Sequence, residues 1–239
     1  MKRTVISEIS TLRKEIESHD DENDRHGLKR SALVNQIYEI IGENVTEDKD
    51  ALLWGYKKYL ITGEMYIDIH RHLKMAECYK KALEIRIQLF REYHFLIPKE
   101  VSKRSFANIV LNILMLRNYY LNDDCDDIYQ LAKKSRLITR ADLDALFQSL
   151  ENIQKRHLNK DPIEESDEYL AVIDEVNAKA RKNMKHHGMG SCHEFWYLKS
   201  KYLEEKGIRW RSPAVLNPSV CAHENASASH VQDSTESMA

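Results

Sequence analysis

Glycine and proline are scarce in this chain of 239 residues, which contains 7 glycines and 4 prolines. These 11 residues are about 5% of the chain, whereas the two types together average roughly 12% in proteins. No glycine lies between Gly63 and Gly188. Because antiparallel sheets use glycine at their tight turns, the scarcity argues against a sandwich or barrel. It also leaves no glycine-rich phosphate loop, which excludes Rossmann and P-loop nucleotide sites.

Long apolar runs and a strong net charge are missing as well. No run of 18 uncharged apolar residues occurs, so we expect no membrane-spanning helix and no membrane partner. Residues 1–8 lack the apolar core of a signal peptide. Lysine and arginine number 36 and aspartate and glutamate 38, and this balance by itself predicts no nucleic-acid partner. The cysteines (Cys78, Cys125, Cys192 and Cys221) form no tight framework, which favours reduced thiols and a cytoplasmic location.

What the chain does contain is apolar residues at spacings of three and four, the pattern of amphipathic helices. The fold class expected is all-α, either an irregular multi-helix bundle or a short tetratricopeptide-like helical array. Gly42 is expected to end the second helix, and Ser191 to cap the last one. The most apolar helix is expected to be central and buried, with Phe106 among its apolar residues. The expected helices span about 4–18, 28–42, 48–76, 74–95, 101–122, 125–136, 143–158, 162–185 and 191–207.

Breaks in these patterns divide the chain into four expected parts. Residues 1–45 form an N-terminal helical hairpin, and residues 46–160 form a helical core. Residues 161–218 form a C-terminal helical segment that contains a Gly-Ser-Cys-His loop. The last part, 219–239, is rich in alanine, serine and polar residues and is expected to be a disordered tail.

A repeat is visible within the expected core, at about 52–135. Gly63, Tyr66, Tyr79, Ala82 and Leu83 occupy the small and aromatic positions of a tetratricopeptide motif, and Tyr59 stands where that motif has tryptophan. From Ala82 to Asn108 the chain resembles the longer, kinesin-light-chain-like variant of the repeat. The resemblance implies paired helices that approach closely at small residues and present a groove to a protein partner. The alternative is an irregular bundle with chance matches.

The C-terminal segment holds an unusual cluster of imidazoles and a thiol. His187, Cys192 and His193 lie on either side of two glycines, which would let the loop fold back on itself. Imidazole nitrogen and thiolate sulfur are the ligands that zinc prefers, so these three residues are a candidate metal site. The spacing matches no standard zinc finger. The alternative is a glycine turn followed by a helix whose Cys192, Phe195 and Trp196 pack inward, with no cofactor.

The residues that follow this loop form a second recognisable pattern. It runs from Gly188 to Pro218 and includes Gly190-Ser191-Cys192-His193-Glu194-Phe195-Trp196, Gly207-Ile208, Trp210, Ser212-Pro213 and Leu216-Asn217-Pro218. This segment resembles the closing segment of an uncharacterised bacterial protein family of unknown function. The resemblance therefore implies a bacterial source and no particular activity.

The same region is basic and aromatic. Nine lysines or arginines and three glutamates lie between Ala178 and Arg211, and five aromatic residues are interleaved with them. Cations bind phosphates and aromatic rings stack on bases, so region 179–211 is a candidate nucleic-acid site. Its candidate residues are Lys179, Arg181, Lys182, Lys185, Lys199, Arg209 and Arg211. The alternative is a solvated helix face whose charges pair with the acidic stretch 161–175.

No catalytic motif accompanies these patterns. The chain contains neither a Gly-x-Ser-x-Gly elbow nor a His-Glu-x-x-His zinc motif, and a nucleophile built from Cys192 and His193 lacks an orienting third residue. The function expected first is therefore a non-enzymatic helical module that binds a protein partner. A nucleic-acid-associated protein and a metal-binding protein are the alternatives.

Overall fold

The computed structural model of the chain describes residues 3–19, 24–154, 158–186, 188 and 190–218. These residues form helices and no strand, which confirms the all-α class. The chain divides into two compact units, 1–157 and 158–239, and each has its own hydrophobic core. This division lies close to the boundary after residue 160 that the sequence predicts.

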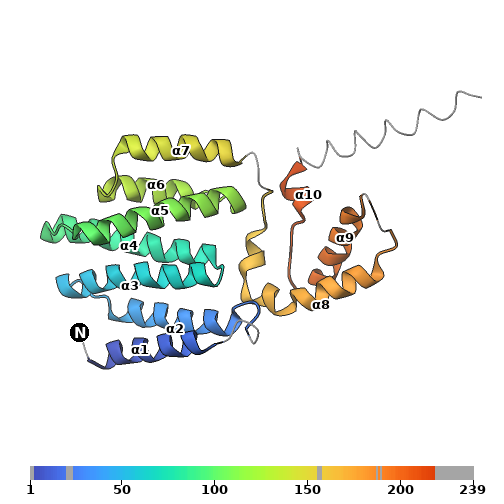
Figure 1. Cartoon of the computed structure of the whole chain (residues 1–239), viewed down its shortest axis with the longest axis horizontal. Helices are drawn as coiled ribbons and strands as arrows, with labels where there is room; N and C mark the ends of the chain where they lie inside the picture. The colour runs from blue at the N-terminus through green and yellow to red at the C-terminus, as the bar shows by residue number, and fades with distance from the viewer. Residues whose placement is uncertain (1–2, 20–23, 155–157, 187, 189, 219–239) are drawn as a thin grey trace, which may run out of the picture. The chain divides into compact units, whose positions relative to one another are not determined.

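The N-terminal unit is a stack of helices in which each hairpin lies on the one before it (Figure 1). Successive helices contact one another, and α3 also contacts α5, α4 contacts α6, and α5 contacts α7. Contacts to the next helix and the one after it are the arrangement of a helical solenoid. The helices are α1 (Arg3–Ser18), α2 (Leu28–Asn44), α3 (Lys49–Asp68), α4 (His72–Tyr93), α5 (Lys99–Tyr120), α6 (Asp124–Ser135) and α7 (Arg140–Gln154).

A close helix approach in this stack lies between α3 and α4. Gly63 has no side chain, and a Cβ atom built there would lie 2.4 Å from the Tyr79 ring, which is fully buried. Only glycine at this position lets the ring pack against the α3 backbone. Tyr56 and Tyr66 fill the neighbouring core, which also includes Val5 and Ile9 of α1. The first hairpin therefore shares its core with the helices that follow it.

Several expected helix boundaries were wrong: the helix expected to begin at residue 162 begins at Asp167, and three others also differ. Residues 69–71 form a turn between α3 and α4, because His70 adopts a left-handed conformation with φ of 57°. Gly42 lies inside α2, which continues to Asn44. Ser191 is the first residue of α9 (Ser191–Glu204), and Gly190 occupies the N-cap position with φ of 84°. The spacing of apolar residues does not show at which residue a helix begins or ends, and this is why these boundaries were misplaced.

The C-terminal unit is smaller and is built on the hairpin of α8 (Asp167–Asn183) and α9. A short 3-10 turn, η1 (Pro162–Glu165), precedes α8, and the four-residue helix α10 (Pro213–Leu216) ends the described chain. Between α9 and α10, Ile208 and Trp210 are buried while Arg209 and Arg211 are exposed. This alternation shows that residues 208–211 are extended along the hairpin, with one face in the core.

Some sequence predictions lie outside the described residues, namely those for His187 and for the tail 219–239. Within the described part of the chain, no helix is long and apolar enough to cross a membrane.

Candidate interaction surfaces

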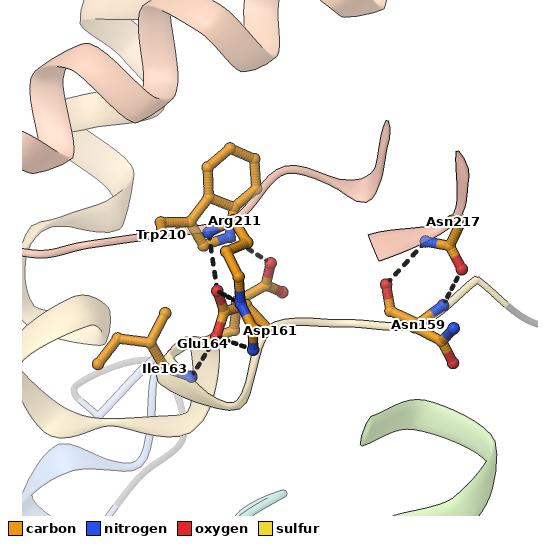
Figure 2. Close-up of polar contacts among 7 residues, drawn as sticks. All are labelled: Asn159, Asp161, Ile163, Glu164, Trp210, Arg211 and Asn217. Atoms are coloured by element: carbon orange, nitrogen blue, oxygen red, sulfur yellow. Dashed lines mark hydrogen bonds and ion pairs between the residues drawn. The ribbon is translucent and has the colours of Figure 1, made fainter. Parts of the chain in front are cut away.

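A set of hydrogen bonds ties the two ends of the C-terminal unit together (Figure 2). Asp161 is buried, and its carboxylate accepts hydrogen bonds from the backbone N–H of Arg211 at 2.7 Å and from the Arg211 Nε at 3.0 Å. The same carboxylate accepts from the Ile163 N–H and so caps η1. Asn159 and Asn217 bond to each other through side-chain and backbone groups at 2.7 and 3.1 Å. We call the Asp161 and Asn217 contacts the polar clasp.

Trp210 joins this clasp to the core of the unit. Its indole N–H donates to the Glu164 carboxylate at 2.7 Å, and its ring packs beneath Lys199. The Lys199 ammonium lies 4.2 Å from the centre of the Trp210 ring and 5.3 Å from that of Tyr169. Burial lowers the pKa of Lys199 below its ordinary value, because the charged form loses solvent there.

The seven basic residues predicted to bind nucleic acid therefore fall into two groups. Lys179 pairs with Glu205 at 2.8 Å, Arg211 pairs with Asp161, and Lys199 lies against aromatic rings. Of these three, Arg211 pairs with the acidic stretch 161–175 as the alternative expects, whereas the partner of Lys179 lies outside that stretch. The other four are exposed and form no ion pair with a described residue: Arg181, Lys182, Lys185 and Arg209.

Two of the three predicted metal ligands are described, and both lie in the first turn of α9. Cys192 and His193 are half-buried neighbours, and the His193 ring meets the Trp196 ring edge-on with centres 5.3 Å apart. Phe195 and Trp196 pack against the core of the unit, as the structural alternative expects. In the part of the chain that the structure describes, no three metal-ligating side chains come together.

An opening in the N-terminal unit was not predicted from the sequence. It measures about 270 Å³ and lies between the first turns of α5 and the loop that joins α6 to α7. Its lining is apolar at Phe106, Leu137 and Ile138, and Lys99 and Lys103 stand on the α5 side. Phe106 was expected in the core, but 38% of its surface is exposed. We call this opening the Phe106 pocket.

The exposure of Phe106 follows from the unexpected polar composition of the buried face of α5. Ser105, Asn108 and Asn112 are buried, and the Ser105 hydroxyl is hydrogen-bonded to that of Tyr56. The buried face of α5 therefore carries polar residues, and Phe106 lies on a different face of the helix. The spacing of Ser105, Asn108 and Asn112 is itself helical, and this was the one sequence signal for the arrangement.

Comparisons of the chain with protein-family models, with curated proteins and with solved structures gave no match.

Proposed function

We propose that this protein is a non-enzymatic helical interaction module, and that its N-terminal unit binds a protein partner at the Phe106 pocket. The observation that carries the proposal is a partly exposed phenylalanine at the edge of an apolar opening. Aromatic residues are enriched among the anchors of protein interfaces, and burial of a full phenylalanine side chain contributes roughly 1.5–3 kcal/mol. Since 38% of Phe106 is exposed, part of that gain is available to a partner.

The arrangement of the helices supports the same proposal. A tetratricopeptide-like stack keeps its surface helices in fixed register, because each helix contacts the next, and α3, α4 and α5 also contact the one after it. The close approach of Gly63 to Tyr79 is what the predicted small and aromatic positions of such a repeat require. A rigid stack lets a partner bind at little cost in conformational entropy. The proposal places the protein in the cytoplasm of a bacterial cell, where Cys78 and Cys125 remain free thiols.

The test is capture of polypeptides from a nuclease-treated bacterial lysate by the full chain, compared with a Phe106→Ala variant. Tyr197→Ala is the matched control, because Tyr197 is an exposed aromatic residue of the other unit. We expect at least a tenfold loss of specific capture with Phe106→Ala and no loss with Tyr197→Ala. Equal capture by the wild type and Phe106→Ala would contradict the proposal.

A further inference from the structure

Three cations of the C-terminal unit gather at one end of its helical hairpin. Arg181 and Lys182 lie in the last turn of α8, and Lys185 follows two residues after the helix ends. All three are exposed and form no ion pair with a described residue. Cations are favoured in this last turn, because the C-terminal end of a helix dipole is negative.

Glu194 fixes this end of α8 against the first turn of α9. Its carboxylate accepts hydrogen bonds from the backbone N–H groups of Lys185 at 2.8 Å and His186 at 3.0 Å. The His186 ring lies 3.1 Å from the same carboxylate. These bonds hold the pKa of Glu194 below its usual value, because they favour its charged form. The negative charge of Glu194 thus faces the backbone of this turn, and the lysine and arginine side chains remain outside it.

The exposed ring of Tyr197 lies one turn of α9 after Glu194, whose carboxylate bonds to the Lys185 backbone. His193, Tyr197 and Lys201 are spaced four residues apart, so they lie along one face of the helix. Tyr197 is 69% exposed, the most of any tyrosine among the described residues. His193 and Trp196 form a ring pair in the turn before it. This end of the hairpin therefore combines positive charge with an accessible aromatic face.

The fourth free cation of the predicted set belongs elsewhere. Arg209 lines an opening with Glu168 and Val172, in the first half of α8. Glu168 and Lys182 are fourteen residues apart on that helix, which corresponds to roughly 20 Å at 1.5 Å per residue. Of the candidate nucleic-acid site over residues 179–211, three free cations and one exposed ring thus lie at this end of the hairpin.

We propose that the end of α8 and the exposed face of α9 bind single-stranded nucleic acid, with Arg181, Lys182 and Lys185 on successive phosphates and an unpaired base stacked on Tyr197. Phosphate contacts need accessible cations that no carboxylate neutralises, and these three residues are exposed and form no ion pair with a described residue. Stacking on a side chain needs a base that is not paired, so a single strand fits the site better than a duplex. This function is separate from the proposed protein-binding pocket and does not depend on it.

The first experiment measures fluorescence anisotropy of a labelled 20-nucleotide uridine RNA titrated with the full chain in 50–200 mM KCl. Three phosphate contacts to a single strand predict a slope of about −2 for the logarithm of the affinity against that of the salt concentration. The affinity should therefore fall roughly fifteenfold over this range. A duplex DNA of 20 base pairs should bind more weakly than the RNA, because its bases are already stacked.

Matched variants test whether these particular residues are responsible. The triple variant Arg181→Gln, Lys182→Gln, Lys185→Gln should abolish most of the binding and its salt dependence. Its control is Lys57→Gln, Lys133→Gln, Lys134→Gln, which removes three exposed cations from the N-terminal unit and should bind normally. Tyr197→Ala should weaken binding roughly tenfold, and Tyr197→Phe should not, since it keeps the ring. Circular dichroism of each variant establishes that it has folded.

Four outcomes would overturn the proposal. They are absence of RNA binding at 50 mM KCl, equal losses in the two triple variants, equal affinity for RNA and duplex, and no effect of Tyr197→Ala. Vesicles of phosphatidylglycerol and phosphatidylcholine serve as a competing polyanion. If they displaced the RNA and their own binding ignored Tyr197→Ala, the site would be one for anionic lipid and the nucleic-acid proposal would fail.

Discussion

The two units of this chain are held together in different ways. The N-terminal unit relies on apolar stacking, with large tyrosines packed where Gly63 lets two helices approach closely. The C-terminal unit has a small core of eight buried residues and adds the polar clasp around Asp161. A smaller domain buries a smaller fraction of its surface than a larger one, so the C-terminal unit depends more on such directed bonds. The comparison shows that one all-α chain can stabilise one unit mainly by apolar packing and another by adding buried hydrogen bonds.

The largest expected effect is on the polar clasp. Asp161→Ala removes the cap of η1 and leaves the Arg211 backbone N–H and the Trp210 segment without their partner. We expect the C-terminal unit to lose about 3 kcal/mol, because one cap and several charge-assisted bonds disappear together. Hydrogen exchange of the full chain should show amides of α8 and α9 exchanging roughly a hundredfold faster, with α3 and α4 unchanged. Glu168→Ala, which removes an exposed acid nearby, is the control.

Equal acceleration of exchange in both units after Asp161→Ala would contradict the distinction between them. An unchanged α8 would show that the clasp contributes little.

The next effect concerns the close approach within the N-terminal unit. Gly63→Ala places a Cβ atom 2.4 Å from the buried Tyr79 ring, whereas Gly42→Ala meets its nearest atom at an ordinary 3.5 Å. Overpacking costs about 1–3 kcal/mol, and alanine recovers up to about 1 kcal/mol of helix propensity. Gly63→Ala should therefore speed hydrogen exchange of the α3 and α4 amides. Gly42→Ala should slow hydrogen exchange slightly in α2, where Gly42 lies. A stabilising Gly63→Ala would show that the helices have room to separate.

The smallest effect concerns buried tyrosine hydroxyls, which are more numerous in the N-terminal unit. Burial raises the pKa of Tyr38 from 10.0 to about 12 and also raises that of Tyr79. The protonated hydroxyls contribute their full stabilisation below the ordinary pKa of 10.0. This stabilisation is lost as the pH rises through the raised pKa values of the folded protein. The guanidinium concentration at the midpoint of unfolding should therefore decrease as the pH is raised from 9 to 11.5.

Tyr79→Phe separates this effect from others, because the Tyr79 hydroxyl is buried and forms no hydrogen bond with a described residue. The variant should gain about 1 kcal/mol at neutral pH and lose less stability in alkali. The exposed Tyr197→Phe should change neither value. If Tyr79→Phe were destabilising, the hydroxyl would have a partner such as a buried water.

Much of the secondary structure could be predicted from the sequence, because amphipathic helices repeat at a fixed period. The first helix was expected at 4–18 and spans Arg3–Ser18, and the helix expected at 101–122 spans Lys99–Tyr120. The turn at His70 could not be foreseen, since a positive φ at histidine depends on the packing around it. Helix periodicity fixes which side of a helix is apolar, but it leaves the breaks undetermined.

The candidate sites were less predictable, because they depend on pairs that are distant in sequence. Asp161 and Arg211 are fifty residues apart, so no local pattern shows that one neutralises the other. The same holds for Lys179 with Glu205 and for Lys199 with Trp210. Two local signals did exist for the clasp. One is an aspartate before Pro162, and the other is the alternation from Ile208 to Arg211.

The two proposals place a protein-binding surface on one unit and a nucleic-acid surface on the other. Protein capture and RNA affinity, determined side by side for two full-length variants, test whether these surfaces are separate. We predict that Phe106→Ala loses the captured protein and binds RNA normally. The triple variant Arg181→Gln, Lys182→Gln, Lys185→Gln should lose RNA and capture protein normally. If either variant lost both activities to the same degree, the claim of separate surfaces would be wrong.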